Sequence, residues 1–286
     1  MKAVSNKVEV IGNVRCSLGE TPVWCSDSQS LLWVDIQQQQ LLRYWPEQGG
    51  RTEIHPLPAV TSAILLTNQP ETFLAVSQCG IKLYDYPTRR FTLIHPWPEE
   101  DTRPNEAAIA PDGALWFSSM DPSALHAIGC WYRLSPETHV LQRLLSKQWV
   151  PNTLAWTKQG LWFADSLRHA IYHGTFSGDA LVVTRCYPVG GIPDGSALSS
   201  EDQLFNANWG GSCLVRYQIG GDELHELGRI ALPVKQPSSC TFGGAMLSDL
   251  YITSATIGLT EPGATDGALL KISTALTGIP AGRFQL

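Results

Sequence analysis

The sequence lacks several features that would place it in common functional classes. It has no run of lysine or arginine, and its formal net charge is −6. Phosphate binding usually requires a basic patch, so no nucleic-acid partner is expected. No apolar stretch approaches the length that spans a bilayer, and residues 1–6 lack the apolar core of a signal peptide. We therefore expect a protein that binds neither nucleic acid nor membrane.

Signs of secretion and of cysteine pairing are also missing. The seven cysteines are odd in number, none forms a C-x-x-C pair, and no N-x-[ST] site occurs. Without a secretory signal, reduced thiols are the simpler interpretation. These features favour a cytoplasmic protein.

Familiar catalytic motifs are absent as well. The chain contains no H-E-x-x-H, no Walker A motif and no G-x-G-x-x-G. It also contains no G-x-S-x-G, so a serine-hydrolase elbow is not supported.

A short strand-like unit recurs through the chain at steps of 41 to 46 residues. A second alternating run follows most units, and period-two alternation between Gly, Pro and Asn predicts antiparallel strands. Repeats of about 40–45 residues with about four strands each are typical of propeller blades. We predict an all-β, six-bladed β-propeller that forms a single domain over residues 1–286. The second residues of the six units are Trp33, Leu74, Trp116, Trp162, Phe205 and Tyr251.

A ring of blades must close, because an open ring leaves an exposed edge strand. Residues 7–11 precede the first unit and have no blade of their own. We predict that this N-terminal strand completes the sixth blade beside residues 269–272. A β-sandwich or two β domains would be the alternative, but the even spacing and the lack of a linker argue against both.

One position in each repeat is predicted to face the central channel, at the same height in every blade. Two carboxylates and two amides would then converge on one axis. Crowded carboxylates raise each other's pKa, and a divalent cation removes that penalty. Oxygen ligands suit calcium, magnesium or manganese, and zinc with added water is also compatible. Alternatively, these are turn residues that bond their own backbone. The six positions are Glu20, Ser62 or Ala63, Asn105, Asn152, Asp194, and Ser239 or Cys240.

At these residues the chain resembles the senescence marker protein/gluconolactonase/luciferin-regenerating enzyme family. The resemblance implies a six-bladed propeller with one catalytic divalent metal ion in the channel and hydrolysis of sugar lactones. It implies Glu20, Asn152 and Asp194 as metal ligands, and Arg103 and Asn105 as substrate contacts. The matching segments, in order along nearly the whole chain, are residues 18–24 with 33–36, 111–120, 151–152, 164–166, 191–195 and 237–244.

The chain departs from the family pattern at two places. The family often has Asn-Asp-Gly where this chain has Asn105-Glu106-Ala107, and it often has glycine at the position of Thr153. Both departures leave the implied metal ligands intact, and the identity of the substrate stays open.

The implied reaction is a gluconolactonase-like opening of a lactone ring by water. A bound cation would polarise the carbonyl, stabilise the oxyanion and acidify water. Asp194 would also serve as general base. Arg103 and Asn105 would bond the sugar hydroxyls or the carbonyl oxygen. Glu106 and Asp121 would accept hydrogen bonds from further hydroxyls, although Glu106 could equally be a solvated loop carboxylate.

Three other hypotheses stay open. The chain could be a non-catalytic calcium-binding regulatory protein of the regucalcin type, a metal-free interaction propeller, or a related hydrolase of esters or phosphotriesters. A small-molecule sugar lactone is the expected partner, and the protein is expected to be a monomer or a weak homo-oligomer.

Overall fold

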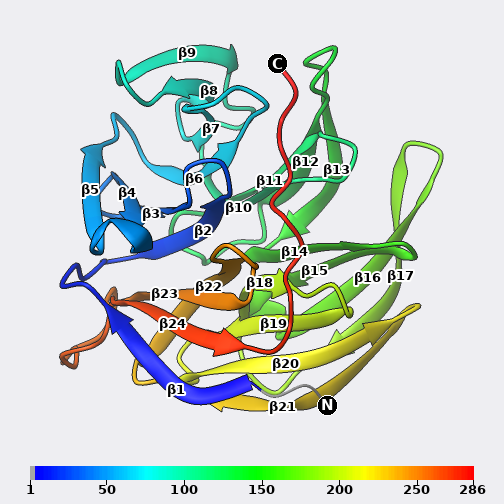
Figure 1. The fold of residues 1–286 in the computed structure, drawn as a ribbon. Helices are drawn as coiled ribbons and strands as arrows, with labels where there is room; N and C mark the ends of the chain where they lie inside the picture. The colour runs from blue at the N-terminus through cyan, green and yellow to red at the C-terminus, as the bar shows by residue number, and fades with distance from the viewer. Residues whose placement is uncertain (1–3) are drawn as a thin grey trace.

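The computed structural model describes residues 4–286, and within them the strands form six antiparallel sheets of four strands each (Figure 1). The predicted six-bladed β-propeller is therefore confirmed. Blade 1 consists of β2 (Gly19–Cys25), β3 (Ser30–Asp35), β4 (Gln40–Trp45) and β5 (Arg51–Pro56). Blade 2 consists of β6 (Thr61–Leu66), β7 (Thr72–Ser77), β8 (Gly80–Asp85) and β9 (Arg90–His95). Blade 3 consists of β10 (Arg103–Ile109), β11 (Leu115–Met120), β12 (Gly129–Leu134) and β13 (Leu141–Gln148).

Blades 4 to 6 complete the ring in the same strand order. Blade 4 consists of β14 (Pro151–Thr157), β15 (Gly160–Asp165), β16 (Ala170–Ser177) and β17 (Ala180–Pro188). Blade 5 consists of β18 (Pro193–Leu198), β19 (Gln203–Asn208), β20 (Cys213–Gly220) and β21 (Glu223–Ala231). Blade 6 consists of β22 (Gln236–Gly243), β23 (Asp249–Ala255), β24 (Leu269–Thr274) and β1 (Val4–Ile11).

Two single-turn 3₁₀ helices, Pro46–Gln48 and Ser166–Arg168, are the helical segments in residues 4–286. No helix in this range is long and apolar enough to cross a membrane.

The predicted ring closure is present. β1 pairs antiparallel with β24, with Val10 opposite Leu270 and Ile11 opposite Leu269. The first strand of every blade also packs against the first strands of both neighbouring blades. The prediction of one domain over residues 1–286 stays a prediction, and residues 1–3 lie outside the described range.

The recurring strand-like unit is the second strand of each blade. All of its residues are buried in β3, β11 and β19, and Trp162 of β15 is fully buried. The units therefore recur because each second strand is covered on both faces by the core between blades. The strand before each unit is then the one that lines the channel.

The pairing of the first and second strands shifts register once in every blade, at the same level of the ring. Each shift inserts an extra residue, as in a β-bulge, and turns the side chains around it. The shifts lie between Glu20 and Val23, Thr61 and Ala63, Pro104 and Ala107, Asn152 and Leu154, Pro193 and Ser196, and Pro237 and Ser239.

The C-terminal segment, which the sequence patterns did not reveal, crosses one end of the ring (Figure 1, red). Gly278 bridges to Ser199 of blade 5, and Phe284 bridges to Thr67 next to blade 2. The amide of Phe284 donates to the carbonyl oxygen of Leu66 at 2.9 Å, and its ring is fully buried. The segment therefore joins two blades on opposite sides of the channel.

We expect Phe284→Ala to lower the free energy of unfolding by about 3–5 kcal/mol, because it removes a fully buried ring from the join between the C-terminal segment and blade 2. Urea unfolding would measure the loss. Leu286→Ala, at a side chain that is 43% exposed, is the control and should unfold almost as the parent does. Equal stability of Phe284→Ala and the parent would contradict this role of the segment.

Candidate active site

The shared bulges bring the ends of distant segments to one level of the channel. Glu20 pairs with Val34 and Asn152 pairs with Ala164, each directly before its bulge. Asn105 and Asp194 lie within the shifted stretches of β10 and β18. These four residues, each from a different blade, therefore lie near the start of their inner strands and at a common height in the channel.

Blades 2 and 6 place small residues at this level. In blade 2 the shifted stretch between Thr61 and Ala63 contains Ser62, one of the two residues expected there. In blade 6 the shifted residue is Ser238, one position before the expected Ser239 or Cys240, so counting back from the marker residue stops short in this blade. Neither blade places a carboxylate or amide at this position.

A chain of hydrogen bonds connects the predicted polar residues across three blades. Arg103 Nη1 donates to Asn105 Oδ1 at 3.0 Å, and Asn105 Nδ2 donates to Asn152 Oδ1 at 3.2 Å. Asn152 Nδ2 donates to Ser166 Oγ at 2.9 Å, and Ser166 Oγ donates to the carbonyl oxygen of Pro193 at 2.6 Å. The residue after Pro193 is Asp194, so this series of hydrogen bonds ends next to the second predicted carboxylate.

The carboxyl groups of Glu106 and Asp194 are buried, Glu20 is partly buried, and the three groups lie close enough to affect one another. Burial, reinforced by Glu106, raises the pKa of Glu20 to about 8, whereas Arg103 lowers it in part. Burial raises the pKa of Glu106 to about 7. Burial, followed by Glu20 and Glu106, raises the pKa of Asp194 well above its ordinary value. We call Glu20, Arg103, Glu106 and Asp194 the charged cluster.

The charged cluster holds more negative than positive charge. Three carboxylates face one guanidinium, which leaves two negative charges uncompensated when all groups are ionised. Unpaired buried charges are costly, so such a cluster favours protonation or a bound cation. The charge balance and the oxygen donors fit a divalent cation.

A cation at this level would need an amide ligand. In residues 4–286, no group of three or more His, Cys, Asp and Glu side chains is arranged to hold a metal ion. The residues that fit as ligands are the predicted ones, namely the carboxylates of Glu20 and Asp194 and the Oδ1 atom of Asn152, which the hydrogen bond to Ser166 orients. These assignments remain predictions.

The hydrogen bonds of the Asp121 carboxylate are made to residues of its own loop and not to the charged cluster. Its carboxylate accepts from the amide and Oγ of Ser123, the amide of Leu125 and His126 Nδ1, at 2.8–3.1 Å. These bonds, led by the Ser123 amide, hold the pKa of Asp121 below its usual range. The carboxylate therefore holds the loop between β11 and β12, which begins next to Met120, the partner of Arg103. A direct contact between Asp121 and a substrate remains a prediction.

Two contacts of the site were not recognised in the sequence. The carboxylate of Glu106 accepts from the amide of Ala107 at 2.9 Å, and the backbone of Thr153 also bonds it. The hydroxyl of Thr153 donates to the carbonyl oxygen of Asp194 at 2.6 Å. The departure from glycine at Thr153 was the available signal, but it does not reveal the partner.

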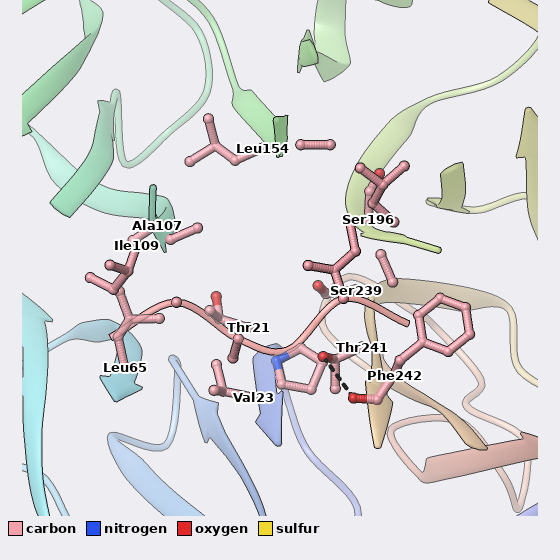
Figure 2. Close-up of a pocket in the computed structure, with 18 of the residues that line it drawn as sticks. Thr21, Val23, Leu65, Ala107, Ile109, Leu154, Ser196, Ser239, Thr241 and Phe242 are labelled. Atoms are coloured by element: carbon pink, nitrogen blue, oxygen red, sulfur yellow. Dashed lines mark hydrogen bonds between the residues drawn. The ribbon is translucent and has the colours of Figure 1, made fainter. Parts of the chain in front are cut away.

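A cavity of about 280 Å³ lies beyond the bulges, toward the C-terminal segment (Figure 2). Its walls are mainly apolar, and Glu106 contributes its charged group. Residues 279–282 of the C-terminal segment form part of the wall. The charged cluster is therefore placed between this cavity and the end of the channel where the inner strands begin. Labelled wall residues in Figure 2 include Val23, Leu65, Ile109, Leu154 and Phe242.

Comparison with known proteins connects this geometry to one family. The family described as "SMP-30/Gluconolactonase/LRE-like region" matches residues 18–256. L-arabinolactonase of Azospirillum brasilense is 29% identical over 98% of this chain and 96% of its own. Pentonolactonase XacC of Haloferax volcanii is 30% identical over 94% of each chain. These relatives support hydrolysis of a sugar lactone.

A solved structure supports the fold. The crystal structure of a calcium-binding protein, regucalcin, from Agrobacterium tumefaciens superimposes with a TM-score of 0.88 at 23% identity, covering 97% of each chain. The propeller architecture thus extends over nearly the whole length of both proteins.

We expect the metal-free protein to lose stability as the pH rises from 5 to 8, by an amount that depends on Glu106. Because the pKa of Glu106 is raised from 4.5 to about 7, the folded chain keeps a proton that the unfolded chain releases in this range. Its contribution is therefore fully present below pH 4.5 and is lost as the pH rises through about 7. Thermal unfolding in chelator would measure it.

Glu106→Gln is the matched control for this prediction. Burial lowers the pKa of His55 and His173, which destabilises the fold at acidic pH in both proteins, so the difference between parent and variant reports the Glu106 carboxyl group together with its effect on Glu20 and Asp194. A difference in unfolding midpoint that does not change between pH 5 and 8 would contradict the prediction.

Proposed function

The chain belongs to the SMP-30/gluconolactonase/LRE-like family, and from this premise we propose that it is a metal-dependent hydrolase that opens a sugar lactone to the aldonic acid. The observation that carries the proposal is the gathering of three buried or partly buried carboxyl groups, one guanidinium and two amides at one level of the channel. This set would provide ligands for a cation and donors for a polyhydroxylated substrate.

Glu20, Asn152 and Asp194 would hold one divalent cation, either Ca²⁺, Zn²⁺, Mg²⁺ or Mn²⁺. When bound, such a cation supplies Lewis-acid polarisation of a carbonyl and acidification of water. The fold holds the carboxyl groups of Glu20 and Asp194 where burial and repulsion disfavour their ionised forms unless a positive charge is bound. Cation binding and deprotonation of these side chains are therefore coupled.

Asp194 would accept the proton of the attacking water on a carboxylate oxygen. In the metal-free site, burial, followed by Glu20 and Glu106, raises the pKa of Asp194 and makes its carboxylate more basic than that of an exposed aspartate. The proton could later reach the ring oxygen as the acyl–oxygen bond breaks and the hydroxy acid forms. This role for Asp194 is part of the proposal.

Arg103 and Asn105 would orient the substrate. In the described part of the chain, the hydrogen bonds of Arg103 start from Nη1, so Nε and Nη2 remain as donors for the lactone oxygens. Asn105 is held by Arg103 and Asn152, so its position is coupled to the proposed cation site. Glu106 would accept from a sugar hydroxyl, and Asp121 would act nearby through the loop that it holds.

We expect five-carbon lactones to be among the substrates, because the names of the two lactonase relatives refer to arabinose and to pentoses. Gluconolactone remains the six-carbon candidate. The cytoplasmic location and a monomeric or weakly associated state are further parts of the proposal.

A panel of five- and six-carbon aldonolactones, assayed for acid release with and without chelator, tests the proposed activity. We expect turnover of at least one lactone, loss of that turnover in chelator, and recovery when a divalent cation is added back. Cation binding without turnover of any lactone would instead support the calcium-binding regulatory alternative. Turnover that chelator leaves unchanged would contradict the metal-dependent mechanism.

We expect Asp194→Ala and Asn152→Ala each to abolish lactone hydrolysis with little change in circular dichroism, because each removes a proposed cation ligand. Asp179→Ala is the control, since Asp179 lies exposed in the turn between β16 and β17. Full activity of the Asp194→Ala protein would refute the assigned site.

A further inference from the structure

Thr153 has an unfavourable backbone conformation at a fully buried position. Its φ angle is 56°, in the left-handed region, although threonine is β-branched and that region strongly disfavours such residues. Backbone strain of this kind costs about 1–3 kcal/mol and persists only where surrounding contacts enforce it. Thr153 is the bulge residue of β14 and directly follows Asn152. The contacts that enforce the conformation should therefore reveal why threonine is present.

The hydroxyl group of Thr153 forms a compact network with blade 5. It donates to the carbonyl oxygen of Asp194 at 2.6 Å and lies 2.9 Å from Ser196 Oγ. It also accepts from Asn206 Nδ2 at 3.1 Å. Asn206 Nδ2 in turn donates to the same Asp194 carbonyl oxygen and to Ser196 Oγ, both at 2.9 Å. Two donors thus hold the main chain of Asp194.

A second link joins the same two blades one residue earlier. Ser166 Oγ, which receives the hydrogen bond of Asn152, donates to the carbonyl oxygen of Pro193. The carbonyl groups of Pro193 and Asp194 are therefore both bonded to side chains of blade 4. These links fix the separation of Asn152 and Asp194, which come from segments 42 positions apart.

The charges around Asp194 explain why its backbone needs this support. Its carboxylate lies near Glu20 and Glu106, and repulsion between like charges favours an outward movement of any group that can move. A main chain that is hydrogen-bonded twice resists such movement. Glycine, which the family often has at this position, would adopt the φ angle without strain but would offer no hydroxyl group.

We propose that Thr153 is a positioning residue, whose hydroxyl group holds the backbone of Asp194 at the distance from Asn152 that one divalent cation requires. The inference rests on the proposed function, because it assumes that these two side chains share a cation. It assigns to Thr153 no contact with the substrate.

The test compares three variants of the full-length protein after treatment with chelator. Thr153→Val keeps the branched shape and removes the hydroxyl group, Thr153→Ser keeps the hydroxyl group, and Thr153→Gly removes both the hydroxyl group and the strain. Ca²⁺, Mg²⁺, Mn²⁺ and Zn²⁺ are each titrated by calorimetry, and thermal unfolding is measured with and without the cation that binds most tightly.

We expect Thr153→Val to weaken cation binding about tenfold, the effect of losing one well-formed buried hydrogen bond. Thr153→Ser should bind within about twofold of the parent. Thr153→Gly should also bind more weakly, even though relief of strain keeps it folded, so the test does not depend on the stability of the valine variant. A purely structural role would lower the unfolding temperature and leave cation affinity unchanged.

Ser62→Ala is the matched control. Ser62 occupies the bulge of β6, is fully buried, and its Oγ atom has no hydrogen-bond partner in the described part of the chain. Loss of this hydroxyl group should leave cation affinity at the parent value.

The outcomes separate this inference from the proposed function. If the parent protein binds none of the four cations, the metal-dependent function fails and the role of Thr153 fails with it. If the parent binds a cation and both Thr153→Val and Thr153→Gly bind it equally well, only the role of Thr153 is overturned.

Discussion

Closure of the ring is the constraint on which the other features depend. Each inner strand packs between the inner strands of two neighbouring blades, so a blade cannot shift along the axis without disturbing the next. The pairing of β1 with β24 joins the two ends of the chain within one sheet. The C-terminal segment adds a connection across the channel between blades 5 and 2. Side chains from remote segments are therefore held at a common height.

The closed ring makes the charged cluster both achievable and costly. Three carboxyl groups on different blades cannot move apart, because the inner strands that carry them are packed on both sides. Burial raises the pKa values of Glu20, Glu106 and Asp194, and repulsion by neighbouring carboxylates raises those of Glu20 and Asp194 further. The guanidinium of Arg103 offsets only part of the charge. An arrangement that disfavours its own ionised form is well suited to bind a cation, and this links the fold to the proposed chemistry.

The chain combines a family architecture with local features of its own. Lactonase relatives align with nearly its whole length, so the overall architecture is that of the family. Glu106 and Thr153 are two of the departures noted in the sequence, and they contact each other: the backbone of Thr153 bonds the Glu106 carboxylate, while the hydroxyl group of Thr153 bonds the backbone of Asp194. Differences in substrate or cation preference within the family would be expected to arise at such positions.

The sequence by itself determined the number of blades and the strand that closes the ring, and it predicted a common level for Glu20, Asn152 and Asp194. It could do so because burial of each second strand imposes a regular pattern on the chain, and a repeated position in sequence becomes a repeated height in a ring. Only the tertiary structure decided the path of residues 275–286, the local bonding of Asp121 and the network around Thr153. These features depend on contacts between particular atoms of segments that follow no repeat, and a pattern of residue types carries no information about which donor meets which acceptor.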